Sequence, residues 1–72
     1  MRIAILGAGA WGTALAISLS TQHQVTLWTK FPDHYAELAS QRINLSFFPD
    51  FPLPKSLSVT DSLYVALGAA DL

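Results

Sequence analysis

The 72-residue chain contains no cysteine and few charged residues. The absence of cysteine excludes a disulfide-stapled scaffold, a thiolate metal site and a cysteine nucleophile, and it fits a reducing compartment. The formal net charge is only −1, which gives no long-range field that would recruit nucleic acid or an anionic membrane. We therefore expect a cytoplasmic protein without a nucleic-acid partner.

Long hydrophobic runs and reactive clusters are missing as well. Three glycines and the polar residues 22–24 break the apolar N-terminal segment, so no stretch reaches the roughly 20 apolar residues that a membrane span needs. His23 and His34 have no carboxylate or second histidine at a metal-ligand spacing, and both are predicted to lie on the surface. No nucleophile-elbow serine or paired acids are evident, so we expect neither metal ligands nor catalytic residues.

The chain does have a glycine-rich turn near its start. Apolar residues 3–6 lead into Gly7-x-Gly9-x-x-Gly12, and helix-forming residues 13–19 follow without a proline or a charge. In a dinucleotide-binding unit, the first glycine allows the tight turn, the second lets the pyrophosphate approach the backbone, and the third lets helix and strand pack closely. Free N–H groups at the helix start then hold the phosphates. The motif predicts such a unit, with a purely structural strand-helix corner as the alternative.

The remaining pattern predicts an α/β fold, the first half of a doubly wound Rossmann-type parallel sheet. We expect strands over residues 3–6, 25–29 and 57–60, and helices over residues 11–21, 33–42 and 62–67. That order is β-α-β-α-β plus a short helix, with the strands arranged third, second, first. Tyr35, Leu38 and Ala39 should face the sheet, and residues 69–72 resemble the start of a fourth strand. All 72 residues should belong to one dinucleotide-binding domain.

Proline and capping residues set the expected boundaries in the second half. Pro49, Pro52 and Pro54 fall close together, and proline cannot continue a helix or donate a ladder hydrogen bond. Residues 44–55 are therefore predicted to form an extended loop. Thr60 or Asp61 should cap the last helix, which Gly68 should end.

The position after the second strand bears on the choice of cofactor. An acidic residue about 20 positions after the glycine turn binds the ribose 2′-hydroxyl of NAD, whereas a basic residue accommodates the 2′-phosphate of NADP. This chain has Thr29, Lys30 and Phe31 there and no carboxylate. Because Lys30 can meet a phosphate dianion, NADP(H) is favoured, with NAD(H) as the alternative cofactor. Lys30 could also be an ordinary solvated charge.

Two tryptophans are candidates for the site. The backbone N–H of Trp11 should contact the pyrophosphate, and the small Ala10 leaves room beside it. The Trp11 ring either closes over the cofactor or packs in the core, whereas Trp28 lies within a strand pattern and is assigned to the core. The candidate cofactor-binding residues are thus Gly7, Gly9, Ala10, Trp11, Gly12 and Lys30.

Five short segments along the chain form a set: residues 7–16, Leu27-Trp28, Arg42-x-Asn44, Phe48-Pro49 and Leu53-Pro54. Together they resemble the N-terminal part of bacterial NAD(P)-dependent glycerol-3-phosphate dehydrogenase. That family reduces dihydroxyacetone phosphate to sn-glycerol 3-phosphate, a phospholipid precursor, in the reversible reaction. The resemblance implies cofactor contacts at Ala10, Trp11 and Lys30, and it implies that Phe47 lines the cofactor pocket. Phe31 departs from the family, in which many members place a polar or acidic residue before the proline.

The resemblance also implies what this chain lacks. The family's catalytic lysines and its all-helical substrate domain would lie beyond Leu72. We therefore expect the phosphorylated substrate to bind only in a longer enzyme, and the 72-residue chain alone to be inactive. The first strand would keep an unpaired edge that invites self-association, and the fragment should be marginally stable and bind cofactor weakly. A dinucleotide sensor without catalysis, or a dehydrogenase for another substrate, are the competing functions.

Overall fold

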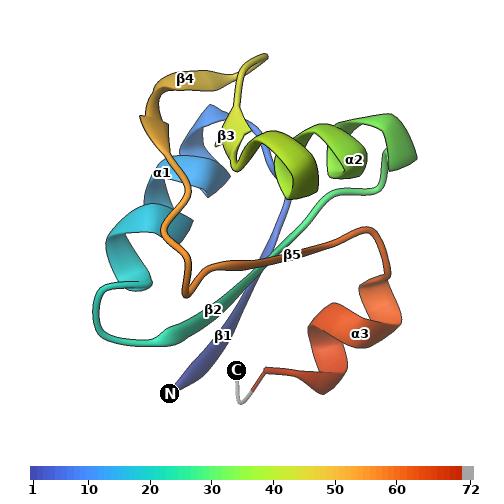
Figure 1. Cartoon of the computed structure of the whole chain (residues 1–72). Helices are drawn as coiled ribbons and strands as arrows, with labels where there is room; N and C mark the ends of the chain where they lie inside the picture. The colour runs from blue at the N-terminus through green and yellow to red at the C-terminus, as the bar shows by residue number, and fades with distance from the viewer. Residues whose placement is uncertain (71–72) are drawn as a thin grey trace.

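The computed structural model describes residues 1–70. Three strands, β1 (Arg2–Leu6), β2 (Gln24–Trp28) and β5 (Ser58–Thr60), form a parallel sheet in the order β1-β2-β5. Figure 1 shows α1 (Ala10–Leu19) and α3 (Leu63–Gly68) on opposite faces of this sheet, and α2 (Pro32–Gln41) lies against β5. The predicted Rossmann-type half-fold and its strand order are confirmed.

The central strand β2 is covered on both faces. Val25, Thr26 and Leu27 are consecutive and all buried, which is typical of a parallel strand between two helical layers. Its in-register pairing with β1 runs from Gln24 opposite Arg2 to Trp28 opposite Leu6. The core therefore lies around β2, and its buried members are Ala8, Ala16, Val25, Leu27, Leu38, Leu53 and Leu57.

The second helix begins and ends close to the predicted positions. Pro32 occupies its first turn, where the missing N–H costs nothing. The helix ends at Arg42, which adopts a left-handed conformation with φ 55°. Leu38 is buried and Tyr35 is half-buried, but Ala39 is exposed. The prediction for Ala39 was wrong because the inward face of α2 passes through residues 34, 37 and 38 instead.

The predicted loop over residues 44–55 contains regular structure. A two-stranded antiparallel sheet pairs β3 (Ile43–Asn44) with β4 (Phe48–Pro52). Both strands are edges, so Pro49 and Pro52 need no ladder N–H on their outer side. The prolines exclude a central strand but not this ladder, which is why the loop prediction was wrong.

The last helix, α3, is capped by Ser62, which was not the predicted cap residue. The Ser62 hydroxyl accepts a hydrogen bond from the Val65 N–H at 3.2 Å, and Thr60 Oγ1 accepts one from the Ser62 N–H at 3.1 Å. Neither Thr60 nor Asp61 is the cap residue. The Ala69 N–H donates to the Val65 carbonyl at 3.0 Å, so residues 69–70 continue the helix end. The remainder of the predicted fourth strand lies outside the described residues.

The surface of residues 1–70 bears on two further expectations. Among them, no helix has the length and apolar character to cross a membrane. Strand β1 pairs with β2 on one side only in this part of the chain. Self-association through the other edge stays a prediction.

Candidate functional site

The glycine turn begins directly after β1. The Gly7 N–H donates to the Trp28 carbonyl at 3.0 Å, which extends the β1–β2 ladder by one residue. Gly7 then turns the chain with φ +134°, a conformation that side chains of L-residues rarely adopt. The first glycine therefore makes the sharp exit from the sheet that the spacing predicted.

The other two glycines have different surroundings. A Cβ on Gly12 would overlap the Gly7 carbonyl oxygen, so Gly12 lets α1 pack against the turn. A Cβ on Gly9 would meet nothing within 4 Å. The Thr13 N–H makes a helical hydrogen bond to the Gly9 carbonyl at 3.0 Å, and the N–H groups of residues 10–12 precede it without a partner inside α1. Open space at Gly9 thus lies beside unpaired donors at the positive end of a helix.

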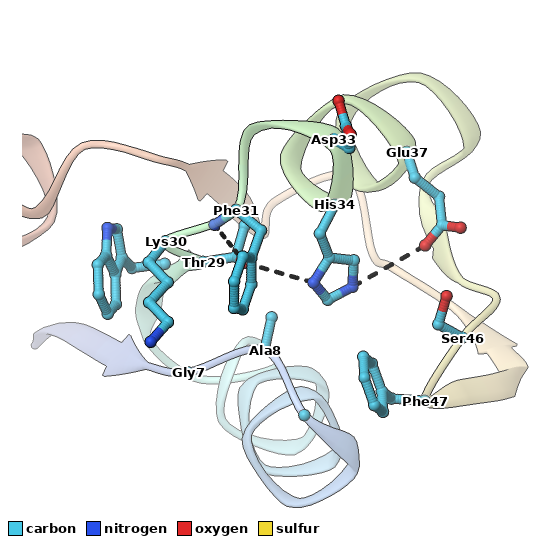
Figure 2. Close-up of a pocket in the computed structure, with 12 residues that line it drawn as sticks. Gly7, Ala8, Thr29, Lys30, Phe31, Asp33, His34, Glu37, Ser46 and Phe47 are labelled. Carbon is cyan, nitrogen blue, oxygen red and sulfur yellow. Dashed lines mark hydrogen bonds and ion pairs between the residues drawn. The ribbon is translucent and has the colours of Figure 1, made fainter.

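A cavity of about 910 Å³ lies between this turn and the start of α2. It opens at the carboxyl ends of β1 and β2, where doubly wound sheets bind their ligands. Figure 2 shows its lining side chains, with the glycine turn on one side and α2 on the other. The cavity is lined by Gly7, Ala8, Gly9, Trp28, Thr29, Lys30, Phe31, Asp33, His34, Glu37, Ser46 and Phe47.

Charged side chains of both signs border the cavity. Lys30 is exposed, and its ammonium lies 5.2 Å from the centroid of the Phe31 ring. Asp33 and Glu37 come from α2 and also line the cavity. Figure 2 shows the Lys30 side chain extending toward Gly7, whereas the Asp33 carboxylate points the other way. Within residues 1–70, Glu37 Oε2 is buried without a hydrogen-bond donor and lies 3.9 Å from His34 Nε2, the contact that Figure 2 draws as a dashed line.

An aromatic wall, which we define as Phe31, His34 and Phe47, lines part of the cavity. The rings of His34 and Phe47 meet edge to face, with centroids 5.5 Å apart. His34 Nε2 lies 3.0 Å from Asn44 Oδ1, and His34 Nδ1 lies 3.3 Å from Thr29 Oγ1. Flat rings beside a cavity of this size can stack against a planar ligand.

Both histidine predictions were wrong. His34 is half-buried and lines the cavity, because its side chain turns inward from the first turn of α2 toward Asn44. His23 is also half-buried, and within the described residues its Nδ1 is buried without a partner. Within residues 1–70, no group of three or more metal-binding side chains occurs.

The two tryptophans differ from their predicted environments. The Trp11 side chain is 89% exposed, so the core-packing alternative for its ring was wrong. With Ala10, Ala14 and Phe48 it borders a separate shallow hollow of about 240 Å³. Trp28 is half-buried and lines the main cavity, so its assignment to the core holds only in part.

The structure brings some of the candidate cofactor residues together and leaves others at the margin. Gly7, Gly9 and Lys30 line the main cavity, whereas Ala10, Trp11 and Gly12 lie beside it in the first turn of α1. Phe47 lines it as the resemblance implied. Two residues of the site were missed: Thr29, which lines the cavity, and Asn44, which forms a hydrogen bond with His34. The Arg42-x-Asn44 segment had been noted only as a motif.

Comparison with known proteins agrees with this geometry. A family model described as the N-terminus of NAD-dependent glycerol-3-phosphate dehydrogenase matches residues 2–72. Over its whole length, the chain has 57% identity to glycerol-3-phosphate dehydrogenase (NAD(P)+) from Nitrosospira multiformis, and the match covers 23% of that protein. It has 56% identity to the Nitrosomonas europaea protein of the same name, and this match covers 22% of that protein. The glycerol-3-phosphate dehydrogenase structure from Coxiella burnetii superposes with a TM-score of 0.90 at 38% identity, over 96% of this chain and 22% of that one.

The chain therefore spans less than a quarter of the length of these relatives, 22–23%. The matched part of this chain carries the glycine turn, the sheet and the cavity described above. The agreement of the family model, the sequence identities and the superposition leads to one assignment. The chain belongs to the family of N-terminal domains of NAD-dependent glycerol-3-phosphate dehydrogenases.

Proposed function

We propose that this domain binds a nicotinamide dinucleotide across the glycine turn. The open space at Gly9, next to the unpaired N–H groups that begin α1, carries the proposal. An anion seated there is held by main-chain donors and by the helix dipole. The adenosine half then occupies the cavity against the aromatic wall. The proposed cofactor-binding residues are Gly7, Gly9, Ala10, Trp11, Gly12 and Lys30.

The first test is direct binding to the purified protein. NADPH and NADH are titrated separately, and the thermal unfolding temperature is followed, because a ligand that binds only the folded state raises it. Trp28 lines the cavity, so its fluorescence gives a second signal. Stabilisation by at least one dinucleotide supports the proposal. No stabilisation and no fluorescence change with either would overturn it.

We propose NADP(H) as the preferred cofactor, with Lys30 facing the 2′-phosphate. Lys30 lines the cavity just after β2, where the adenosine ribose of a bound dinucleotide would lie. In Lys30→Gln, the NADPH dissociation constant should rise about tenfold, the effect of losing a charge-assisted hydrogen bond of roughly 1.4 kcal/mol. The NADH constant should stay within about twofold. Lys55→Gln, at an exposed position away from the cavity, is the matched control. Equal loss for both cofactors would refute the assignment of Lys30.

The names of the relatives support a wider proposal. We propose that the chain forms the cofactor-binding part of a cytoplasmic glycerol-3-phosphate dehydrogenase. The dinucleotide supplies the hydride, and this chain's residues hold and orient it toward dihydroxyacetone phosphate. The test follows the absorbance of the reduced nicotinamide with and without dihydroxyacetone phosphate, using the protein as it occurs in its organism. Dinucleotide binding without substrate-dependent oxidation would favour a sensor.

A further inference from the structure

One side chain bridges the glycine turn and the aromatic wall. Asn44, in β3, is fully buried at 0% exposure. Its Nδ2 donates to the Ala8 carbonyl at 2.9 Å and to Thr13 Oγ1 at 2.8 Å. Its Oδ1 faces the Phe47 N–H at 3.3 Å and His34 Nε2 at 3.0 Å. The amide thus uses both of its donors and both lone pairs of its oxygen.

The partners fix the direction of each hydrogen bond. A carbonyl only accepts, so the Ala8 oxygen must face the NH₂ end of Asn44, and an amide N–H only donates, so Phe47 must face the oxygen end. His34 Nε2, which also meets the oxygen end, must therefore carry a hydrogen. In the neutral ring, Nδ1 is then the acceptor for the Thr29 hydroxyl at 3.3 Å.

The chain of hydrogen bonds runs along one side of the cavity. The Phe31 N–H donates to Thr29 Oγ1 at 3.3 Å, and the network continues through His34 and Asn44 to the Ala8 carbonyl inside the glycine turn. Figure 2 shows Thr29, His34 and Glu37 along this side of the cavity. Asn44 therefore contacts the turn through the Ala8 carbonyl and the aromatic wall through His34 and Phe47.

We propose that Asn44 is a positioning residue that sets the separation between the pyrophosphate site and the adenosine site. This inference rests on the proposed dinucleotide binding. Asn44 itself does not line the cavity, so it acts through Ala8, His34 and Phe47. A dinucleotide touches both walls at once, and its affinity depends on how closely their preformed spacing matches the ligand.

The main experiment measures dinucleotide dissociation constants under conditions where every variant is fully folded. Asn44→Asp keeps the shape of the side chain but removes the donors to the Ala8 carbonyl and to Thr13 Oγ1, and it should weaken binding about tenfold or more. Thr13→Val removes one acceptor of Asn44 and should weaken binding about threefold, whereas Thr13→Ser retains the hydroxyl and should restore the wild-type constant. Ser40→Ala, on the exposed side of α2, is the control.

The outcomes separate the two proposals. Wild-type protein that binds no dinucleotide overturns the proposed function. Wild-type protein that binds, together with folded Asn44→Asp and Thr13→Val variants whose constants stay within about twofold, overturns the role of Asn44. If Asn44→Asp does not fold, the Thr13 pair decides alone, because a merely structural role would change the unfolding temperature but not the constant of the folded protein.

A second measurement needs no ligand. Nitrogen-15 NMR of the His34 ring reports which ring nitrogen carries the hydrogen. We expect Nε2–H in the wild type and loss of this preference in Asn44→Ala. An Nδ1–H ring in the wild type would contradict the network.

Discussion

The glycine turn and the aromatic wall enclose the same cavity, but different parts of the chain hold them in place. Residues 7–12 are contiguous, and their shape follows from backbone conformation and from the absence of side chains at Gly7, Gly9 and Gly12. Phe31, His34 and Phe47 come from the helix start and from the β3–β4 connection. Part-buried hydrogen bonds hold the His34 ring and the main-chain N–H groups of Phe31 and Phe47. The turn is a local structure, whereas the wall depends on contacts between distant segments.

Because the shape of the turn depends on its own backbone, substitutions at its glycines should change stability mainly through backbone geometry. The largest effect is expected for Gly12→Ala, because the new methyl group would overlap the Gly7 carbonyl and neither backbone can yield easily. The free energy of unfolding should fall by about 3 kcal/mol, as measured by denaturant titration. Gly68→Ala is the matched control, since a Cβ there meets nothing within 4 Å, and it should stabilise α3 by roughly 0.5 kcal/mol. Equal effects at both glycines would remove the close-packing role of Gly12.

Gly7→Ala should have the next largest effect. Its φ of +134° strains any L-residue even though the space around it is open. We expect a loss of about 2 kcal/mol in the free energy of unfolding, measured in the same denaturant titration. An unchanged transition midpoint would mean that the exit from β1 can adopt another conformation.

Gly9→Ala separates binding from stability. Gly9 has a φ of −76°, and a Cβ at this position would meet no atom within 4 Å, so the free energy of unfolding should change by only about 0.5 kcal/mol. The methyl group would occupy the space through which the pyrophosphate reaches the main chain, and dinucleotide affinity should fall at least about tenfold. Calorimetric titration measures that loss. Retained affinity would place the phosphates elsewhere.

The smallest effect is expected at Trp11. Its side chain is 89% exposed, so Trp11→Ala should change the free energy of unfolding by less than about 0.5 kcal/mol. Trp28→Ala is the contrasting variant, because Trp28 is half-buried against the sheet, and its loss should cost about 2 kcal/mol. Thermal unfolding of the two variants side by side tests this. A large loss at Trp11 would reveal packing that the exposed ring does not show.

Structural features that depend on neighbouring residues could be predicted from the sequence alone. A strand that leaves the sheet with a positive φ and a helix that starts against that strand both demand glycine, so the spacing of Gly7, Gly9 and Gly12 predicted the turn. The β-branched and aromatic residues over positions 25–29 likewise predicted a strand. These features could be recognised without knowing any distant contact.

The rest of the cavity could not be predicted from the sequence, because its side chains are placed by contacts with residues distant in the chain. His34 was assigned to the surface because its sequence neighbours offer no metal-like spacing, whereas its actual partners are Thr29 and Asn44. Nothing in the local pattern indicates that Asn44 is buried, since asparagine is mostly exposed in proteins. The prolines at 49 and 52 led to a loop prediction because they exclude a strand inside a larger sheet. A ladder of two edge strands tolerates them, so the prediction was wrong.

The hydrogen bond between Asn44 and the Ala8 carbonyl joins residues 36 positions apart in the chain. Segments so distant meet late in folding, because the entropy of closing the intervening loop must be overcome first. The strand-turn-helix corner can form early from neighbouring residues, but its final shape waits for α2 and β3 to arrive. In a refolding experiment, the capacity to capture a dinucleotide should therefore appear after helical circular dichroism has recovered.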